Sequence, residues 1–466
     1  MNSMNTICAL STPNGSGAIG VIRLSGSEAI NICNQVFEGK DLSKQKGQTL
    51  HFGKLLNGAD LIDEVLVSLF KGPNSYTGED VIEISCHGSS YILMKVLELL
   101  LEKGAQLAAP GEFTMRAFMN GKMDLAQAEA VADLIASESK AAHDIAMNQM
   151  RGGFSEKIAE LRHELIQFTS LIELELDFAE EDVEFADRDD LKALVNQLLL
   201  MIQKLVASFS TGNALKNGIP VAIVGQPNVG KSTLLNALLN EDKAIVSEIA
   251  GTTRDSIEDT VNLGGLTFRF IDTAGIRETE DVIEKIGIQR TYLMVEKAMV
   301  ILYLVDAVND SAEEVQEVIQ NIKKTIEGKD KQLVVLANKI DKGSFDANKV
   351  PSEIQEKFPE GEKVIYLSAL QQTQLDQLTD YLKQLASDKL KGSNEVIVSN
   401  ARHHQALKQA GEALDRVKNG LESNITGDFL AMDIRQALHF LGEITGTIEI
   451  DRDILGNIFS QFCIGK

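Results

Sequence analysis

The chain has 466 residues, of which 44% are hydrophobic and 24% charged, as is typical of a soluble protein with two to four domains. Its formal net charge of −23 argues against strong non-specific binding of nucleic acid, because phosphate contacts usually come from a basic excess. There is no signal-peptide pattern, no apolar run of the roughly 18 residues that span a bilayer and no metal spacing among the cysteines, so we expect a cytoplasmic protein without membrane contact.

Residues 1–120 are predicted to form a separate α/β domain. Strand patterns cover Val21–Leu24, Glu64–Phe70 and Val81–Cys86, with turn-forming residues between them. An amphipathic helix is predicted over Ser90–Glu102.

The next segment, residues 121–216, has a helical pattern rich in Ala, Leu, Glu and Gln. Gly152-Gly153 interrupts this pattern. A further helix is expected over Leu191–Ser208, ending at Thr211-Gly212. We expect the segment to form the first part of an all-helical domain.

A phosphate-binding loop of the pattern G-x-x-x-x-G-K-[ST] follows a short apolar strand. Gly225 and Gly230 permit backbone angles with which successive N–H groups curl around phosphate oxygens. Lys231 supplies a charge for the β- and γ-phosphates, and the Ser232 hydroxyl is a ligand for Mg²⁺. A helix predicted over Thr233–Asn240 adds its positive N-terminal end.

Two downstream motifs indicate guanine recognition. The first follows the apolar strand Leu333–Ala337 and comprises Asn338, Lys339, Ile340 and Asp341. Its aspartate suits guanine's N1–H and exocyclic amine and offers nothing to adenine. The second follows the strand Val364–Leu367, is expected to bring a backbone amide to the guanine carbonyl, and comprises Ser368, Ala369 and Leu370. Residues 217–383 are therefore predicted to be a GTPase domain.

The residues that would assist hydrolysis lie between these motifs. A magnesium motif follows the strand Leu266–Ile271 and comprises Asp272, Thr273, Ala274 and Gly275. Upstream of it, Thr253 is the expected switch threonine that binds magnesium when the γ-phosphate is present. The position of the usual water-orienting glutamine is Ile276, so another polar residue must substitute. The candidates in the following loop are Glu278, Glu280, Asp281 and Glu284.

Three alternatives remain for neutralising the charge of the transition state. Arg254 and Arg277 are candidate arginine fingers, each of which could equally be a surface charge. A monovalent cation held near Asn228 would have the same effect.

The last segment, residues 384–466, is again helical, over Asn400–Glu422 and Phe429–Thr445. His403-His404 are expected on a solvated helix face. Because helices flank the GTPase domain on both sides, we expect the flanks to pack together with the GTPase domain inserted between them.

Four motifs spread along the chain closely resemble the MnmE or TrmE family of tRNA uridine-modification GTPases. They are Thr6-Ile7 with the segment 19–26, residues 76–80 with His87-Gly88, the stretch from Pro110 to Glu129, and the terminal Phe462-Cys463-Ile464-Gly465-Lys466. The resemblance implies an α/β multidomain fold. Its parts would be an N-terminal folate-binding dimerisation domain, an all-helical central domain and an inserted Ras-like P-loop GTPase domain.

The resemblance also implies potassium-dependent GTP hydrolysis. Potassium would be surrounded by Asn228, Ser247, Ile249 and Thr252, and magnesium held by Ser232 and Thr253, while Glu284 would orient the attacking water. No arginine finger is then required. The implied nucleotide contacts of the loop and switch are Gly225, Asn228, Val229, Gly230, Lys231, Ser232, Thr233, Ser247, Glu248, Ile249, Ala250, Gly251, Thr252 and Thr253.

The implied folate contacts are Arg23, Glu83, Lys122 and Lys466, for 5-formyl- or 5,10-methylene-tetrahydrofolate. Basic groups suit a glutamyl tail, and a carboxylate suits the pterin donors. Arg23 would otherwise be a paired structural arginine, and Glu79 offers the same chemistry as Glu83.

The partners implied by the family are a second copy of the chain, an FAD-dependent flavoprotein of the GidA/MnmG type in a heterotetramer, and tRNA. The implied reaction adds an aminomethyl-type group, such as carboxymethylaminomethyl, to C5 of the wobble uridine at position 34. The alternative is a ribosome-assembly or signalling GTPase without modification chemistry. Such a protein should append a basic RNA-binding module, and neither flank has one.

Overall fold

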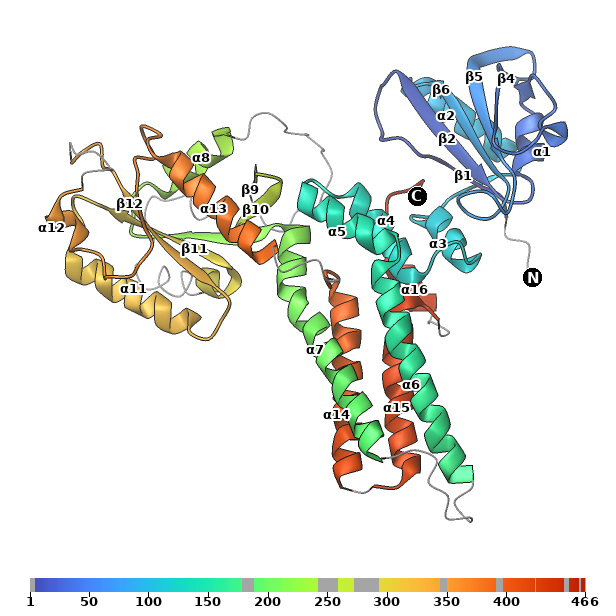
Figure 1. Ribbon diagram of the computed structural model, residues 1–466. Coiled ribbons are helices and arrows are strands. Elements are labelled where there is room, and N and C mark those ends of the chain that lie inside the picture. The colour runs from blue at the N-terminus through green and yellow to red at the C-terminus, as the bar shows by residue number, and fades with distance from the viewer. Residues whose placement is uncertain are drawn as a thin grey trace. The chain divides into compact units, whose positions relative to one another are not determined.

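The computed structural model divides the chain into two compact units (Figure 1). The first contains residues 1–135, 148–198 and 409–466, and the second contains residues 136–147 and 199–408. The residues that the structure describes are 5–177, 188–241, 259–271, 293–343, 350–390, 397–423, 425–447, 452–460 and 462–465. The domain boundaries after residues 120, 216 and 383 stay predictions.

The first unit contains a seven-stranded sheet of order β3-β4-β5-β6-β2-β1-β7, antiparallel except for the β1–β7 pair. Its strands are β1 (Ile7–Leu10), β2 (Ile19–Ser25), β3 (Phe37–Glu38), β4 (Thr49–Asn57), β5 (Asp60–Phe70), β6 (Val81–His87) and β7 (Gln106–Leu107). The core lies between one face of this sheet and the helices α1 (Ala29–Asn34) and α2 (Ser90–Glu102). The predicted bounds of α2 are confirmed, because Leu93, Val96 and Leu100 repeat at helical spacing on its buried face.

The rest of the first unit is helical. Its elements are the 3₁₀ helix η1 (Leu42–Lys44), α3 (Glu112–Met119), α4 (Leu125–Ile135), α6 (Gly153–Asp177), α15 (Gly427–Thr445) and α16 (Arg452–Ser460). Helix α6 precedes the GTPase segment and α15 follows it, yet the two pack together, with Arg162 donating to the Leu438 carbonyl at 2.7 Å. The flanks therefore meet, as expected for an inserted domain.

The second unit contains a six-stranded sheet of order β13-β12-β11-β8-β10-β9, parallel except for the β9–β10 pair. Its strands are β8 (Ile219–Val224), β9 (Asp259–Leu263), β10 (Leu266–Phe270), β11 (Val300–Asp306), β12 (Gln332–Asn338) and β13 (Val364–Tyr366). Its helices include α8 (Lys231–Glu241), α11 (Ala312–Ile326), α12 (Ser352–Gln355) and α13 (Leu375–Leu390). Every residue of β11 is buried, because helices cover both faces of a parallel sheet. Three helices contain residues of both units: α5 (Lys140–Met150), α7 (Arg188–Asn217) and α14 (Ala401–Glu422).

Two expectations about α7 and α14 are wrong. Helix α7 does not end at Thr211-Gly212 but continues to Asn217. Gly212 marks a close approach instead, since a Cβ there would lie 2.2 Å from the Val398 carbonyl oxygen. His403 is not on a solvated face: it is 1% exposed, and the neighbouring His404 stacks on Phe209 at 4.3 Å.

Helix α7 is also the one described helix that is long and apolar enough to cross a membrane, over Leu191–Asn217, by length and composition only. Its buried residues include Val195, Leu198 and Ile202, a single stripe at helical spacing, while Lys192 and Lys204 interrupt the apolar sequence. This pattern is that of an amphipathic helix packed in a protein.

Candidate guanine-nucleotide site

The predicted phosphate loop connects β8 to the first turn of α8. Gly225 has φ +154°, and a Cβ on it would lie 2.3 Å from the Leu304 carbonyl oxygen of β11. Gly230 has φ +106°, and a Cβ on it would lie 2.5 Å from Nδ2 of Asn338. Both glycines are therefore required by backbone conformation and by space, which explains the two fixed glycines of the motif.

Two residues of the Asn-Lys-x-Asp motif support this loop from the end of β12. Asn338 donates to the Val229 carbonyl at 2.7 Å, and Lys339 donates to the Asn228 carbonyl at 2.7 Å. Asn228 itself has φ +62°, a left-handed conformation that asparagine tolerates better than most residues. Two residues of a motif expected to recognise the base thus also support the phosphate loop.

Lys231 lies at the start of α8. Its ammonium donates to the Gly225 carbonyl at 2.9 Å and to the Gln226 carbonyl at 2.8 Å. Burial lowers its pKa from the ordinary lysine value. An ammonium has three donors, so one remains for a phosphate oxygen.

The residues expected to recognise the base, Asp341 and the segment after β13, lie together. Ser368 donates its hydroxyl to Oδ1 of Asp341 at 2.6 Å, and the Ala369 amide donates to Oδ1 of Asn338 at 2.9 Å. Within the described residues, Oδ2 of Asp341 accepts no hydrogen bond. Asp341 is therefore held in place by one oxygen and presents the other as an acceptor.

Asp306, the last residue of β11, belongs to this site, although no sequence motif predicted it. Its carboxylate is 6% exposed and accepts from the Lys339 ammonium at 2.9 Å. Burial would raise its pKa, but hydrogen bonds from Lys339 and Asn309 outweigh burial and lower the pKa to about 2. A usable indication was present in the sequence: a charged residue directly after six apolar ones marks the carboxyl end of a buried strand.

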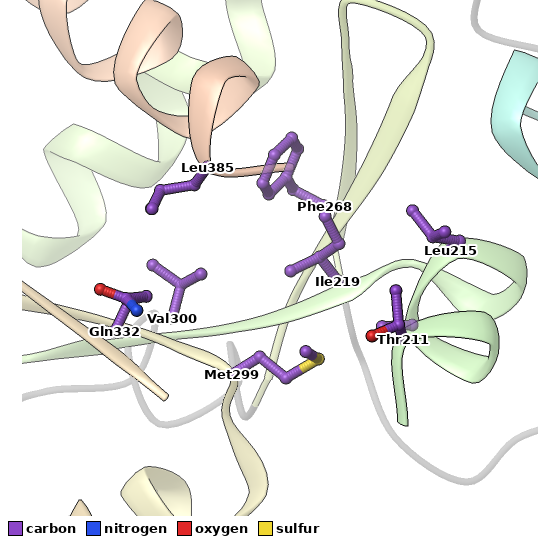
Figure 2. A pocket seen from close by; sticks show the side chains of 9 residues that line it. Thr211, Leu215, Ile219, Phe268, Met299, Val300, Gln332 and Leu385 are labelled. Atoms are coloured by element: carbon purple, nitrogen blue, oxygen red, sulfur yellow. The ribbon is translucent and has the colours of Figure 1, made fainter. Parts of the chain in front are cut away.

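An apolar pocket lies at the end of the six-stranded sheet where its parallel strands begin (Figure 2). Ile219, Val300 and Gln332, the first residues of β8, β11 and β12, line it. Because the phosphate loop follows the last residue of β8, this pocket is no part of the nucleotide site.

The first unit contains a second candidate site around Arg23 of β2. Arg23 forms an ion pair with Oε1 of Glu83 on β6 at 2.8 Å, and its guanidinium carbon lies 5.4 Å from the Tyr76 ring centre and 5.6 Å from that of Phe113. It also donates to the Gly465 carbonyl at 3.4 Å. Gly465 therefore lies beside Arg23. It also lies close to β1, since a Cβ on Gly465 would be 2.2 Å from the Leu10 carbonyl oxygen.

The structure separates the roles of Glu79 and Glu83. Glu79 accepts from Ser25 at 2.6 Å and pairs with the buried Arg116 at 3.2 Å. Oε2 of Glu83, in contrast, accepts no hydrogen bond from the described residues. Glu83 therefore has the acceptor that a pterin would need, while Glu79 is committed to the fold.

Lys122 donates to the Pro73 carbonyl at 2.9 Å. Pro73 precedes Tyr76 in the loop between β5 and β6, but no contact between Lys122 and Arg23 is found in the described residues. The predicted residues that lie outside the described residues are Ser247, Glu248, Ile249, Ala250, Gly251, Thr252, Thr253, Arg254, Asp272, Thr273, Ala274, Gly275, Ile276, Arg277, Glu278, Glu280, Asp281, Glu284 and Lys466.

Two family models and several full-length relatives match this chain. The family model described as the MnmE helical domain matches residues 125–463, and that described as the GTP-binding protein TrmE N-terminus matches residues 6–122. The proteins named tRNA modification GTPase MnmE from Bacteroides thetaiotaomicron and Flavobacterium psychrophilum are 54% and 53% identical to the chain, over 100% and 99% of both sequences. The chain belongs to the MnmE family of tRNA modification GTPases. This confirms the resemblance, the multidomain fold class and the GTPase class that the sequence predicted.

Among solved structures, the G domain of the T. maritima FeoB iron transporter matches 36% of this chain and 98% of its own at 25% identity. Its TM-score is 0.26, so the assignment to the MnmE family rests on the family models and the full-length relatives instead.

Proposed function

We propose that this MnmE-family chain hydrolyses GTP with Mg²⁺ and K⁺ and, with an FAD-dependent flavoprotein partner, adds an aminomethyl-type group to C5 of the wobble uridine of certain tRNAs. It would do so in the cytoplasm, as a homodimer within a heterotetramer. The observation that carries the proposal is the combination in one chain of a braced phosphate loop and an Arg23–Glu83 site at the chain end.

The Asn228 side chain offers one oxygen ligand suited to a potassium ion. Asn228 is exposed, and its side-chain amide makes no hydrogen bond to the described residues. An amide oxygen is a hard ligand suited to K⁺ beside the phosphates. When bound, the ion would supply positive charge at the transition state, and Ser232 and Thr253 would hold Mg²⁺.

Hydrolysis is expected to depend on potassium. We predict at least 10-fold faster GTP hydrolysis in potassium than in sodium buffer of equal ionic strength, because charge stabilisation of this kind is worth several kcal/mol. Asn228→Ala should remove this difference, whereas Asn236→Ala on the exposed face of α8 should preserve it. Equal rates of the natural chain in both buffers would refute the potassium assignment.

The Arg23 site fits a reduced folate. The half-buried Tyr76 ring, whose centre lies 5.4 Å from the Arg23 guanidinium carbon, offers an apolar face, and the unbonded Oε2 of Glu83 suits the amino and N–H donors of a pterin. When bound, the folate would supply the one-carbon unit.

Glu83→Gln should weaken binding of 5-formyl-tetrahydrofolate about 10- to 100-fold, because a hydrogen bond to a charged group contributes about 1.5–3 kcal/mol. Titration calorimetry measures the affinity. Glu64→Gln, on the exposed face of β5, is the control and should bind normally. Unchanged affinity of Glu83→Gln would place the folate elsewhere.

An apolar surface on the N-terminal sheet supports the homodimer. Leu50 and Phe52 of β4 and Leu66 of β5 are 60%, 65% and 41% exposed, and Phe52 and Leu66 are paired across the two strands. The opposite face of β4 is buried through His51, Gly53 and Leu55. Exposed apolar side chains gathered on one sheet face mark an interface.

Phe52→Glu is therefore expected to convert a dimer into a monomer in light scattering coupled to gel filtration. Burying an unpaired carboxylate at an interface costs several kcal/mol, enough to shift the association constant by at least 100-fold. Met119→Glu, at an exposed apolar residue of α3, should leave the dimer intact. A Phe52→Glu protein that remains dimeric would contradict this assignment.

Nucleoside mass spectrometry of tRNA from cells lacking this chain tests the modification itself. The proposal predicts loss of the modified wobble uridine and its return when the gene is restored. If cells lacking the chain and complemented cells contain the same nucleosides, the ribosome-assembly alternative would be favoured. The net charge of −23 does not support that alternative, because it gives no indication of a basic RNA-binding module.

A further inference from the structure

Asp306 is at the centre of a hydrogen-bonded cluster at the carboxyl end of β11 in the six-stranded sheet. Oδ2 accepts from Nζ of Lys339 and from Nδ2 of Asn309, both at 2.9 Å. Oδ1 accepts from the amides of Val308 and Asn309, both at 3.1 Å. Four donors therefore fix the orientation of one buried carboxylate.

The turn that follows Asp306 is itself braced. Asp310 accepts from the Asp306 amide at 2.8 Å. Lys357 donates to the carbonyls of Ala307 and Val308, both at 3.1 Å, and to that of Asp310 at 2.7 Å. Asp306 is consequently presented to Lys339 from a rigid support.

Lys339 connects this support to the phosphate loop. Its ammonium donates both to Asp306 and to the Asn228 carbonyl, and Lys339 has φ +66°, so its backbone also departs from the usual conformation. Without the carboxylate, an ammonium with a 21% exposed side chain would turn toward water. The Asn228 carbonyl would then lose the bond that accompanies its left-handed backbone.

We propose that Asp306 is a positioning residue for GTP binding and hydrolysis, because it holds the Lys339 ammonium on the Asn228 carbonyl and so fixes the loop residue that faces the β- and γ-phosphates. The expected effect of Asp306 on potassium binding rests on the proposed potassium role of Asn228. The expected effect of Asp306 on nucleotide binding does not. In this arrangement Asp306 contacts neither the cation nor the nucleotide directly, but acts through Lys339.

The test compares Asp306→Asn with the natural chain in two readouts. Release of a fluorescent GDP analogue in sodium buffer should become about 10-fold faster, since the ion pair that holds the Lys339 ammonium is lost. The potassium concentration for half-maximal hydrolysis should rise about 10-fold. Asp306→Glu, which keeps the charge, should restore part of both values.

Asp310→Asn is the matched control, because it removes a neighbouring carboxylate charge but keeps an oxygen that can accept from the Asp306 amide, so the turn and the Asp306–Lys339 pair remain. It should change neither readout by more than about twofold. If Asp306→Asn does not fold, Asn309→Ala removes one donor to Oδ2 and should accelerate GDP release about threefold.

A lower melting temperature with unchanged GDP release would overturn the proposal, because Asp306 would then be merely structural. Absence of potassium stimulation in the natural chain would refute the potassium role alone. The GDP release rate would still decide the role of Asp306.

Discussion

Replacing Asp341 with asparagine is expected to weaken GTP binding by about 10²- to 10⁴-fold and to shift the preference toward xanthosine triphosphate. The carboxylate can accept from both N1–H and the exocyclic amine of guanine, and each such bond contributes about 1.5–3 kcal/mol. An asparagine presents a donor beside its acceptor, which matches the additional carbonyl of xanthine.

The structure supplies the control for this experiment. Ser368 donates to Oδ1 of Asp341 at 2.6 Å, so Ser368→Ala removes the support of the carboxylate but not the carboxylate itself. We expect at most about 10-fold weaker GTP binding with guanine preference retained. Competition between fluorescent GDP and unlabelled nucleotides measures both. An Asp341→Asn protein that still prefers GTP would show that the base is recognised elsewhere.

Gly225→Ala should abolish measurable nucleotide binding, with a loss of at least 100-fold. Its Cβ would lie 2.3 Å from the Leu304 carbonyl oxygen, and this backbone belongs to a central strand that cannot give way. The residue also has φ +154°, which a side chain strains by about 1–3 kcal/mol.

Gly456→Ala is the matched control, because nothing lies within 4 Å of a Cβ at that helical position. Calorimetry with GDP should give the natural affinity for Gly456→Ala and no detectable heat for Gly225→Ala. Circular dichroism should show that both proteins are folded. Normal GDP binding by Gly225→Ala would mean that the phosphate loop adopts another conformation when occupied.

The parts of the fold that were predicted from the sequence have regular patterns. Helix α2 repeats its apolar residues at helical spacing, and β12 is a continuous apolar run. Strand β4 was missed because its buried face contains His51 and Gly53 while Leu50 and Phe52 point outward. Its pattern is the reverse of a normal surface strand, so only the pairing with β5 reveals its orientation.

The positions of side chains were harder to predict than the motifs. The loop motif gave Gly225 and Gly230 correctly as the residues with unusual backbone angles, since the reason lies in the local chain. The Lys339–Asp306 pair joins residues 33 apart, and its members meet only because β11 and β12 are neighbours in register. Sequence patterns within one element do not contain that information.

The end of α7 illustrates a third kind of failure. A glycine in a helical pattern usually weakens the helix, which made Gly212 look like its end. The missing side chain instead leaves room for the backbone of Val398, nearly 190 residues away in the chain. The Val398 amide donates to the Ser208 hydroxyl at 3.0 Å. Tertiary contact outweighs the local cost of glycine, about 1 kcal/mol.

The central claim is that GTP hydrolysis in the second unit drives tRNA modification that depends on the first. Helices α7 and α14 contain residues of both units, so the two are covalently continuous through helical segments. We offer mechanical coupling through these helices as a hypothesis.

The most direct measurement uses purified chain, flavoprotein partner, tRNA, folate and an amine donor, with GTP or a non-hydrolysable analogue. Mass spectrometry then follows the C5-substituted wobble uridine. We predict modified uridine with GTP and at least 10-fold less with the analogue. Equal yields with the two nucleotides would contradict this prediction, because binding without hydrolysis would then suffice.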